Sequence, residues 1–174
     1  MAQQSTEDRL RTLGEELYAR SQTIGNDLGF VKEEGFDPIG AGGGRRVFAL
    51  PSEHAAEFQS RTVLPVERFV VKFALYAPYD RIDGRTQNRR EMDLSESAPP
   101  LFEEFMLPTV GGGEDGFWVV QPYADPIEEP TPEFHETVGR FLNAGYRDEL
   151  SQTENWGRVN GQLRLTDFGY IQNA

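Results

Sequence analysis

The feature that most constrains the fold is a run of β-branched and aromatic residues, Arg68 to Tyr76, with a lysine at its centre. Such a run predicts a strand. Lys72 is one of only two lysines among the 17 basic residues, and its neighbours Val71 and Phe73 are apolar. Because burial of an unpaired ammonium is costly, Lys72 must either find an anionic partner inside the fold or lie on the wet face of an edge strand.

The other expected elements follow from hydrophobic periodicity and turn residues. The pattern predicts three helices, at 5–21, 84–97 and about 131–147. Ser5 can cap the first, whose apolar face is Leu10, Leu13 and Leu17, and the last has the stripe Phe134, Val138, Phe141 and Leu142. Strands are expected at 37–50 (two, with a Gly-rich turn), 68–76, 101–110 and 117–123, and as a hairpin at Asn160-Gly161. The segment 51–65 is expected to be irregular, with at most one helical turn. This order indicates an α+β fold with sequential antiparallel strands.

Composition limits the classes of function. A chain of 174 residues makes one domain. The net charge of −12 argues against a general nucleic-acid or bilayer-surface binder, because both targets are anionic. The absence of cysteine excludes disulfides and thiolate metal sites. No apolar run is long enough to span a membrane, and the N-terminus has no leader-like segment, so we expect a cytoplasmic protein, or a virion-associated one if it is viral.

The basic residues are almost all arginine, fifteen of the 17. An excess of carboxylates with very little lysine is typical of halophilic proteins, in which concentrated salt screens a large net charge. A GC-rich genome that replaces lysine codons by arginine codons gives the same bias. Both interpretations stay open from the sequence.

Four short segments contain residues suited to phosphate chemistry. Gly40, Gly42, Gly43 and Gly44 let backbone N–H groups approach an anion, and Lys72 follows in the strand. Glu91, on the helix expected at 84–97, can pair with Lys72. Asn155 and Asp167, the latter followed by Phe168-Gly169, offer the oxygen ligands that Mg²⁺ prefers. Each segment also has an ordinary structural interpretation: a hairpin turn, an edge-strand lysine, a surface glutamate and a capping aspartate.

In this order and spacing, the segments resemble the protein-kinase superfamily over residues 36–174. The resemblance implies that Gly40 to Gly44 cover the phosphates of ATP and that Val47 lies over the base. It also implies that Lys72, fixed by Glu91, holds the phosphates, while Asn155 and Asp167 hold Mg²⁺. The segment WVVQPYA resembles the hinge, with Val120 near the gatekeeper position and with backbone groups of Gln121 and Tyr123 directed at adenine.

The sequence departs from the family pattern at three places. Arg45 stands at the third glycine position. The family's catalytic aspartate lies five residues before the asparagine, where this chain has Leu150. The nearest upstream acids are Glu149 and Asp148, and Asp148 is the candidate base. The sequence also ends five residues after Gly169, before any segment that would bind a peptide substrate.

The resemblance implies a kinase-like N-lobe with helix C at 36–125 and a rudimentary C-lobe at 126–174. The expected N-terminal helix and its connection, at 1–35, lie outside the resemblance. Two functions remain: a minimal kinase-like domain that binds ATP and Mg²⁺, with or without transfer of a phosphoryl group, or an inactive kinase-like binding or structural module, for example in a viral assembly. An unrelated α+β domain with coincidental motifs is the third possibility. We further expect Phe168, Tyr170 and Ile171 to form an apolar patch, covered partly by helix 5–21 and partly by a protein partner or a second copy.

Overall fold

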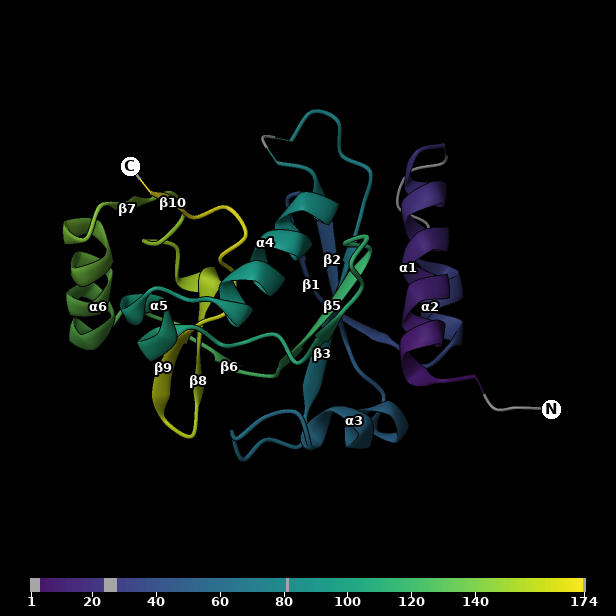
Figure 1. Cartoon of the computed structure of the whole chain (residues 1–174), viewed down its shortest axis with the longest axis horizontal. Coiled ribbons are helices and arrows are strands. Elements are labelled where there is room, and N and C mark those ends of the chain that lie inside the picture. The colour runs from purple at the N-terminus through teal and green to yellow at the C-terminus, as the bar shows by residue number, and fades with distance from the viewer. Residues whose placement is uncertain (1–3, 24–27, 81, 174) are drawn as a thin grey trace.

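A five-stranded antiparallel sheet lies at the centre of the molecule (Figure 1), as described by a computed structural model for residues 4–23, 28–80 and 82–173. Its strand order is β1-β2-β3-β5-β4. The bounds are β1 (Asp37–Gly42), β2 (Arg45–Ala49), β3 (Phe69–Ala74), β4 (Gly111–Gly112) and β5 (Trp118–Pro122). The combination of helices with an antiparallel sheet confirms the α+β class. All six residues of the central strand β3 are buried.

The first hydrophobic core lies between one face of this sheet and the helix α1 (Thr6–Ser21). Figure 1 shows α1 beside the short helix α2 (Gly29–Glu33), with α3 (Ser52–Gln59) at one end of the sheet. The predicted start of α1 is confirmed, since the Ser5 hydroxyl accepts a hydrogen bond from the Asp8 N–H at 3.1 Å. The leucine face of α1 (Leu10, Leu13 and Leu17) is buried with three aromatic residues: Phe36, which precedes β1, and Phe48 and Phe73 of the sheet.

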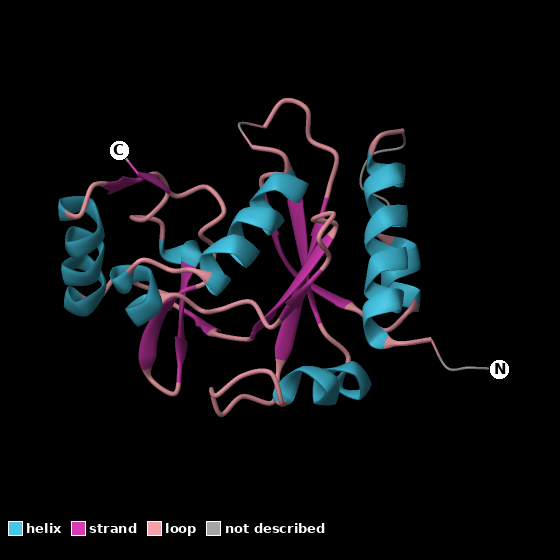
Figure 2. Cartoon of the chain, in the orientation of Figure 1, coloured by secondary structure: helices cyan, strands magenta, loops and turns pink. Residues whose placement is uncertain are grey.

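The opposite face of the sheet carries α4 (Gly84–Glu96), which appears in Figure 2 as the long helix in front of the strands. The side chains alternate along β3, so Val71 and Phe73 enter the first core while Lys72 points toward α4. The side chains that α4 buries are polar, namely Gln87, Asn88 and Glu91. Such residues are rarely fully buried unless they are paired, so this interface is built from hydrogen bonds and ion pairs.

A second hydrophobic core lies on the other side of α4, around a two-stranded hairpin. The elements are α5 (Pro100–Phe105), α6 (Pro132–Asn143), the 3-10 helix η1 (Thr153–Asn155), β8 (Trp156–Val159) and β9 (Gln162–Leu165). The short strand β6 (Asp125–Pro126) pairs with β8, and β7 (Tyr146–Arg147) pairs with β10 (Gln172–Asn173). The predicted turn at Asn160-Gly161 is confirmed, with both residues at positive φ. This core is aromatic: Phe102, Phe134, Phe141, Trp156 and Phe168.

The predicted strand at 101–110 is wrong, because α5 occupies residues 100–105. Pro100 is the first residue of α5, where its missing N–H costs nothing and its fixed φ favours a helix. Phe102 is buried by the helix, which ends before Met106 bridges to Leu165.

Two other element limits differ from the expectation. The last helix ends at Asn143 rather than near 147, because Gly145 turns the chain with a φ of +93°. Leu142, expected in its buried stripe, is 41% exposed. The segment expected to be irregular at 51–65 contains the eight-residue helix α3, which buries Ala55 and Phe58.

The apolar residues near the end of the sequence are covered within the chain. Phe168 and Ile171 are only 1% and 7% exposed, and they belong to the second core. The expected patch, and its expected cover by helix 5–21, are therefore wrong: α1 belongs to the first core, against the sheet. The protein partner was expected because of this patch, so the burial of Phe168 and Ile171 removes the argument for it. None of the described helices is long and apolar enough to cross a membrane.

Candidate functional site

The predicted contact between Lys72 and Glu91 is confirmed. Lys72 is 4% exposed, and its Nζ lies 3.1 Å from Oε1 and 3.0 Å from Oε2 of Glu91. The third Nζ hydrogen is donated to the Thr166 carbonyl at 2.6 Å. An ammonium has three donors, so protein oxygens satisfy all of them. The pair joins β3 to α4 and to the strand end that precedes Asp167.

Arg45 enters the same cluster from the Gly-rich turn. Gly44 adopts a φ of +73°, and Arg45 then starts β2 with its side chain directed inward. Its Nη2 lies 2.9 Å from Glu91 Oε1 and 2.5 Å from Asp167 Oδ1, and its Nη1 donates to Asn88 Oδ1 at 3.1 Å. One guanidinium thus connects β2, α4 and the segment after β9.

Asp167 and Asn155 lie next to each other through the backbone. The Asn155 carbonyl accepts hydrogen bonds from the N–H groups of Thr166 and Asp167, at 2.8 and 3.2 Å. The Asn155 side-chain amide donates to the Glu149 carbonyl at 2.9 Å. Asp167 is the more accessible of the cluster's carboxylates, with a side chain 30% exposed, whereas Glu91 has no exposed surface.

The buried charges shift one another's ionisation. Burial lowers the pKa of Lys72 below its ordinary value, although Glu91 acts in the opposite direction. Burial alone would raise the pKa of Asp167, but the Arg45 and Lys72 cations outweigh it and hold that pKa below its usual value. Burial opposes the charge on Arg45, yet Asp167 and Glu91 together raise its pKa. The pKa shifts of Arg45 and Asp167 thus favour their charged forms at neutral pH, whereas burial opposes the charge on Lys72 and its contact with Glu91 supports it.

A cleft of about 270 Å³ opens between the sheet and the β8–β9 hairpin, beside this cluster. Its walls are mainly apolar and come from β1, β2, β3, β5 and the chain that follows β5. Of the predicted binding residues, six line the cleft: Gly40, Val47, Lys72, Gln121, Tyr123 and Asp167. These residues are far apart in sequence, and the fold brings them together at one opening.

The other predicted binding residues lie outside the cleft lining. Gly42 faces Asp167, since a Cβ on Gly42 would lie 4.0 Å from its Oδ2. Gly43 and Gly44 form the turn tip, which is held to α4: Gln87 Nε2 donates to the Gly43 carbonyl at 2.7 Å. Val120 is in the first hydrophobic core, while the buried Gln121 side chain reaches the cleft instead and donates to the Leu107 carbonyl at 2.8 Å.

The predicted catalytic base is also outside the cleft lining. Asp148 lies in the turn after β7, with a positive φ of 70°, and hydrogen-bonds through its carbonyl to the Leu150 N–H at 2.6 Å. Leu150, at the position five residues before Asn155, is buried in the second core. The structure therefore brings Lys72, Glu91 and Asp167 together but leaves Asp148 apart from the lining.

The side chains do not fit the Mg²⁺ that the resemblance implies. Asp167 already forms an ion pair with Arg45, so a cation bound to it would face a fixed guanidinium. Among residues 4–23, 28–80 and 82–173, no group of three or more His, Cys, Asp or Glu side chains is arranged to hold a metal ion. The argument against Mg²⁺ rests on the Arg45 guanidinium, which is already bound to Oδ1 of Asp167.

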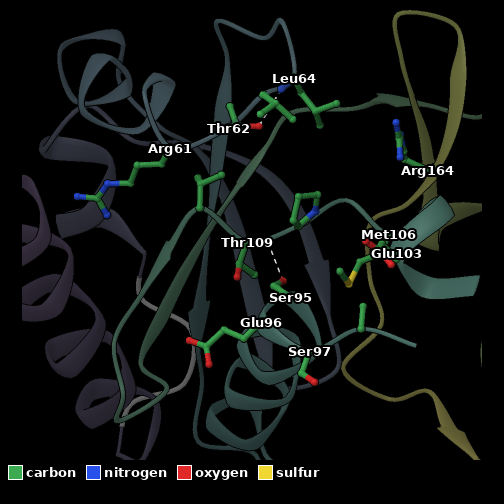
Figure 3. A pocket seen from close by; sticks show the side chains of 14 residues that line it. Arg61, Thr62, Leu64, Ser95, Glu96, Ser97, Glu103, Met106, Thr109 and Arg164 are labelled. Carbon is green, nitrogen blue, oxygen red and sulfur yellow. Dashed lines mark hydrogen bonds between the residues drawn. The ribbon is translucent and has the colours of Figure 1, made fainter. Parts of the chain in front are cut away.

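A larger cavity of about 630 Å³ lies elsewhere, between the α3–β3 connection and the end of α4 (Figure 3). Its two arginines form contacts within the chain: Arg61 pairs with Glu7 at 2.6 Å, and Arg164 Nη1 donates to the Glu104 carbonyl at 3.0 Å. The Nε of Arg164 is buried without a hydrogen-bond partner among the described residues. The Ser95 hydroxyl accepts from the Thr109 N–H at 2.9 Å, drawn as a dashed line in Figure 3. The buried charge cluster lies beside the smaller cleft, which we therefore take as the site.

Sequence reasoning missed three polar residues of the site: Arg45, Gln87 and Asn88. Asn88 Nδ2 donates to the Gly116 carbonyl at 2.8 Å and to the Lys72 carbonyl at 3.3 Å, which fixes α4 against β3. A signal existed for Arg45, because it breaks a glycine pattern next to a strand. Asn88 and Gln87 gave none, since polar residues on a polar helix look like a solvated face.

No protein-family model matches the chain, and no curated protein sequence matches it.

Proposed function

We propose that the chain is a kinase-like module that binds an adenine nucleotide in the cleft beside Lys72 and does not transfer its phosphoryl group. The observation that carries the proposal is the buried Lys72–Glu91 ion pair, which lies at the back of an apolar cleft. Apolar walls with a few convergent polar groups are typical of small-molecule sites. The order of motifs along the chain supports the same class of ligand.

The cleft suits the base and sugar of a nucleotide. Its volume, about 270 Å³, lies just below the usual range for small-molecule sites, which begins at about 300 Å³. Val47 and Val70 supply apolar contact from the sheet, and residues 121–124 border the cleft. An adenine ring needs such apolar faces, although the Tyr123 N–H beside them is already donated to the Arg68 carbonyl at 2.9 Å.

Three features favour binding without transfer. Phosphoryl transfer needs a group that orients the attacking hydroxyl, and the expected position holds the buried Leu150. Asp148 is not among the cleft residues. Asp167, the carboxylate expected to hold the metal, is paired with Arg45 instead.

Calorimetric titration of ATP, ADP and adenosine tests binding, and two matched substitutions locate it. Val70 is on the cleft face of β3, so Val70→Phe fills the cleft, whereas Val63→Phe adds the same bulk at an exposed position beside the larger cavity. We expect wild type and Val63→Phe to bind and Val70→Phe to lose binding while keeping its circular dichroism spectrum. Loss of binding in Val63→Phe alone would assign the ligand to the larger cavity, and no binding by wild type contradicts the proposal.

Incubation with ATP labelled at the γ-phosphate tests the absence of transfer. We expect neither self-labelling nor hydrolysis above the level of an Asp167→Asn variant. Labelled protein or released phosphate that depends on Asp167 would instead support the phosphotransferase.

A further inference from the structure

The Arg45 guanidinium occupies the point at which the two acidic side chains of the site meet. It is within hydrogen-bond distance of both Glu91 and Asp167, and its side chain is only 3% exposed. Asn88 accepts from its other terminal nitrogen at 3.1 Å. Partners on three sides fix the planar group in one orientation.

The cluster is balanced in charge and in hydrogen bonds. Two cations, Lys72 and Arg45, face two anions, Glu91 and Asp167. Lys72 donates its three N–H groups to Glu91 and to the Thr166 carbonyl, and Glu91 also accepts from the Phe168 N–H at 3.3 Å. A buried ionic network is stable only when its members are paired, and this one is paired without an added ion.

A divalent cation on Asp167 would disturb this balance. Metal–oxygen distances for Mg²⁺ are about 2.0–2.1 Å, so an ion bound to the Asp167 carboxylate would lie within about 5 Å of the Arg45 guanidinium. Arginine stays protonated throughout the accessible pH range, so the ion cannot displace a proton to make room. It would either break the Arg45–Asp167 pair or bind the other carboxylate oxygen beside a guanidinium that is held in place, so that two cations repel each other across one carboxylate.

We propose that Arg45 replaces a divalent cation in this site, so that the chain binds its nucleotide without Mg²⁺. The nucleotide part of this inference rests on the proposed function, whereas the exclusion of the metal rests on the contacts of Arg45 alone. Glycine at this position would leave Asp167 free to bind a metal ion. The arginine supplies a permanent positive charge between Glu91 and Asp167.

Titration with Mn²⁺ alone, followed by the loss of its free-ion electron paramagnetic resonance signal, tests the exclusion without any nucleotide. Wild type and Asp167→Asn share the same acidic surface, so weak surface binding is equal in both. We expect identical isotherms, because Asp167 holds no metal in the wild type. One saturable site more in the wild type than in Asp167→Asn would overturn the inference.

Substitution of Arg45 gives the reciprocal result. Arg45→Ala is expected to gain one saturable Mn²⁺ site, the double variant Arg45→Ala/Asp167→Asn to lose it, and Arg45→Lys, which keeps a cation, to gain none. A folded Arg45→Ala without a new site would contradict the role given to Arg45. If circular dichroism shows that Arg45→Ala is unfolded, the comparison of wild type with Asp167→Asn still decides.

Calorimetry with ADP completes the test. The dissociation constant of the wild type is expected to agree within about threefold between EDTA and excess Mg²⁺, and tightening by Mg²⁺ of about tenfold or more would overturn the inference. If ADP does not bind under either condition, the proposed function fails, while the Mn²⁺ isotherms still judge the role of Arg45. The two failures are thus distinguishable.

Discussion

Glu91 is the carboxylate that contacts both buried cations of the cluster, Lys72 and Arg45. It accepts hydrogen bonds from Lys72, Arg45 and the Phe168 backbone, and it has no exposed surface. Two cations therefore share one wholly buried carboxylate. Removing a partner from a buried ion pair is far more damaging than removing one from a surface pair, because the remaining charge is left without water or counter-charge.

Glu91→Gln is therefore expected to lower the free energy of unfolding by about 3–5 kcal/mol, because two buried cations would face only Asp167. Urea denaturation followed by circular dichroism measures it. Glu104→Gln is the control, since Glu104 also binds an arginine, Arg140, but at the surface. A Glu91→Gln variant as stable as Glu104→Gln would show that the cluster does not hold α4 to the sheet.

Asp167 gives the site a dependence on pH. Although burial raises its pKa, Arg45 and Lys72 hold the pKa below that of the unfolded chain. The ionised carboxylate therefore stabilises the fold above the unfolded pKa, near 4, and this contribution is lost as the pH falls toward the lower folded pKa. The excess stability of wild type over Asp167→Asn should shrink as the pH falls from about 6 to about 3, as measured by urea denaturation. If the excess stability of the wild type grew as the pH fell, the pKa of Asp167 would be raised by folding, which contradicts the prediction.

The Gly-rich turn and α4 are held together by a backbone contact that leaves no room for a side chain. Gly84, the first residue of α4, packs on the carbonyl of Gly44, and a Cβ at Gly84 would overlap that oxygen. The same carbonyl accepts from the Leu75 N–H at 2.7 Å. The start of α4 and the turn that delivers Arg45 therefore fix each other's position.

Gly84→Ala should cost about 2 kcal/mol or more, because the turn or the helix must shift by the width of a methyl group. Gly139→Ala is the matched control: Gly139 lies inside α6 with nothing within 4 Å of its would-be Cβ. That substitution should stabilise the chain by about 0.5–1 kcal/mol, because alanine favours a helix. Thermal denaturation of both variants measures the difference, and equal effects would contradict the packing argument.

The elements that could be predicted from sequence are those whose local signals agree. The run containing Lys72 and the Asn160-Gly161 hairpin each combine suitable residues with clear ends. The segment 101–110 failed because Pro99-Pro100 stops one helix and starts another, and a single sequence does not say which effect prevails. Similarly, the Lys72–Glu91 contact follows from the need of a buried lysine for an anion, whereas nothing local tells whether Arg45 points outward or into the cluster.

Across the entire chain, acidic residues outnumber basic ones by 29 to 17. Lys72 and Arg45 are committed to buried ion pairs, whereas Arg68, which also lines the cleft, is exposed and lies over the Tyr123 ring. Most of the excess carboxylate lies in water, where like charges repel one another. Added salt screens this repulsion over a distance that falls to about 3 Å at molar ionic strength. The charge imbalance is thus a property of the surface rather than of the site.

We expect the urea midpoint to rise as KCl is increased from low to molar concentration, because screening relieves repulsion in the compact state. The slope should decrease in a Glu128→Gln/Glu129→Gln variant, in which two exposed charges are removed from the acidic stretch before α6. Midpoints that stay flat or fall with KCl would remove the halophilic interpretation and leave the codon bias.

The Arg45 contacts also bear on how the chain reaches its native state. This side chain joins residues that lie 43, 46 and 122 positions away in sequence. Closing such long loops is costly in entropy, so these bonds are expected to form after the local helices and hairpins. A contact that is absent from the transition state affects the rate of unfolding rather than the rate of folding. The cluster between the two cores would then act as a late-closing latch, whose loss speeds unfolding and leaves the refolding rate nearly unchanged.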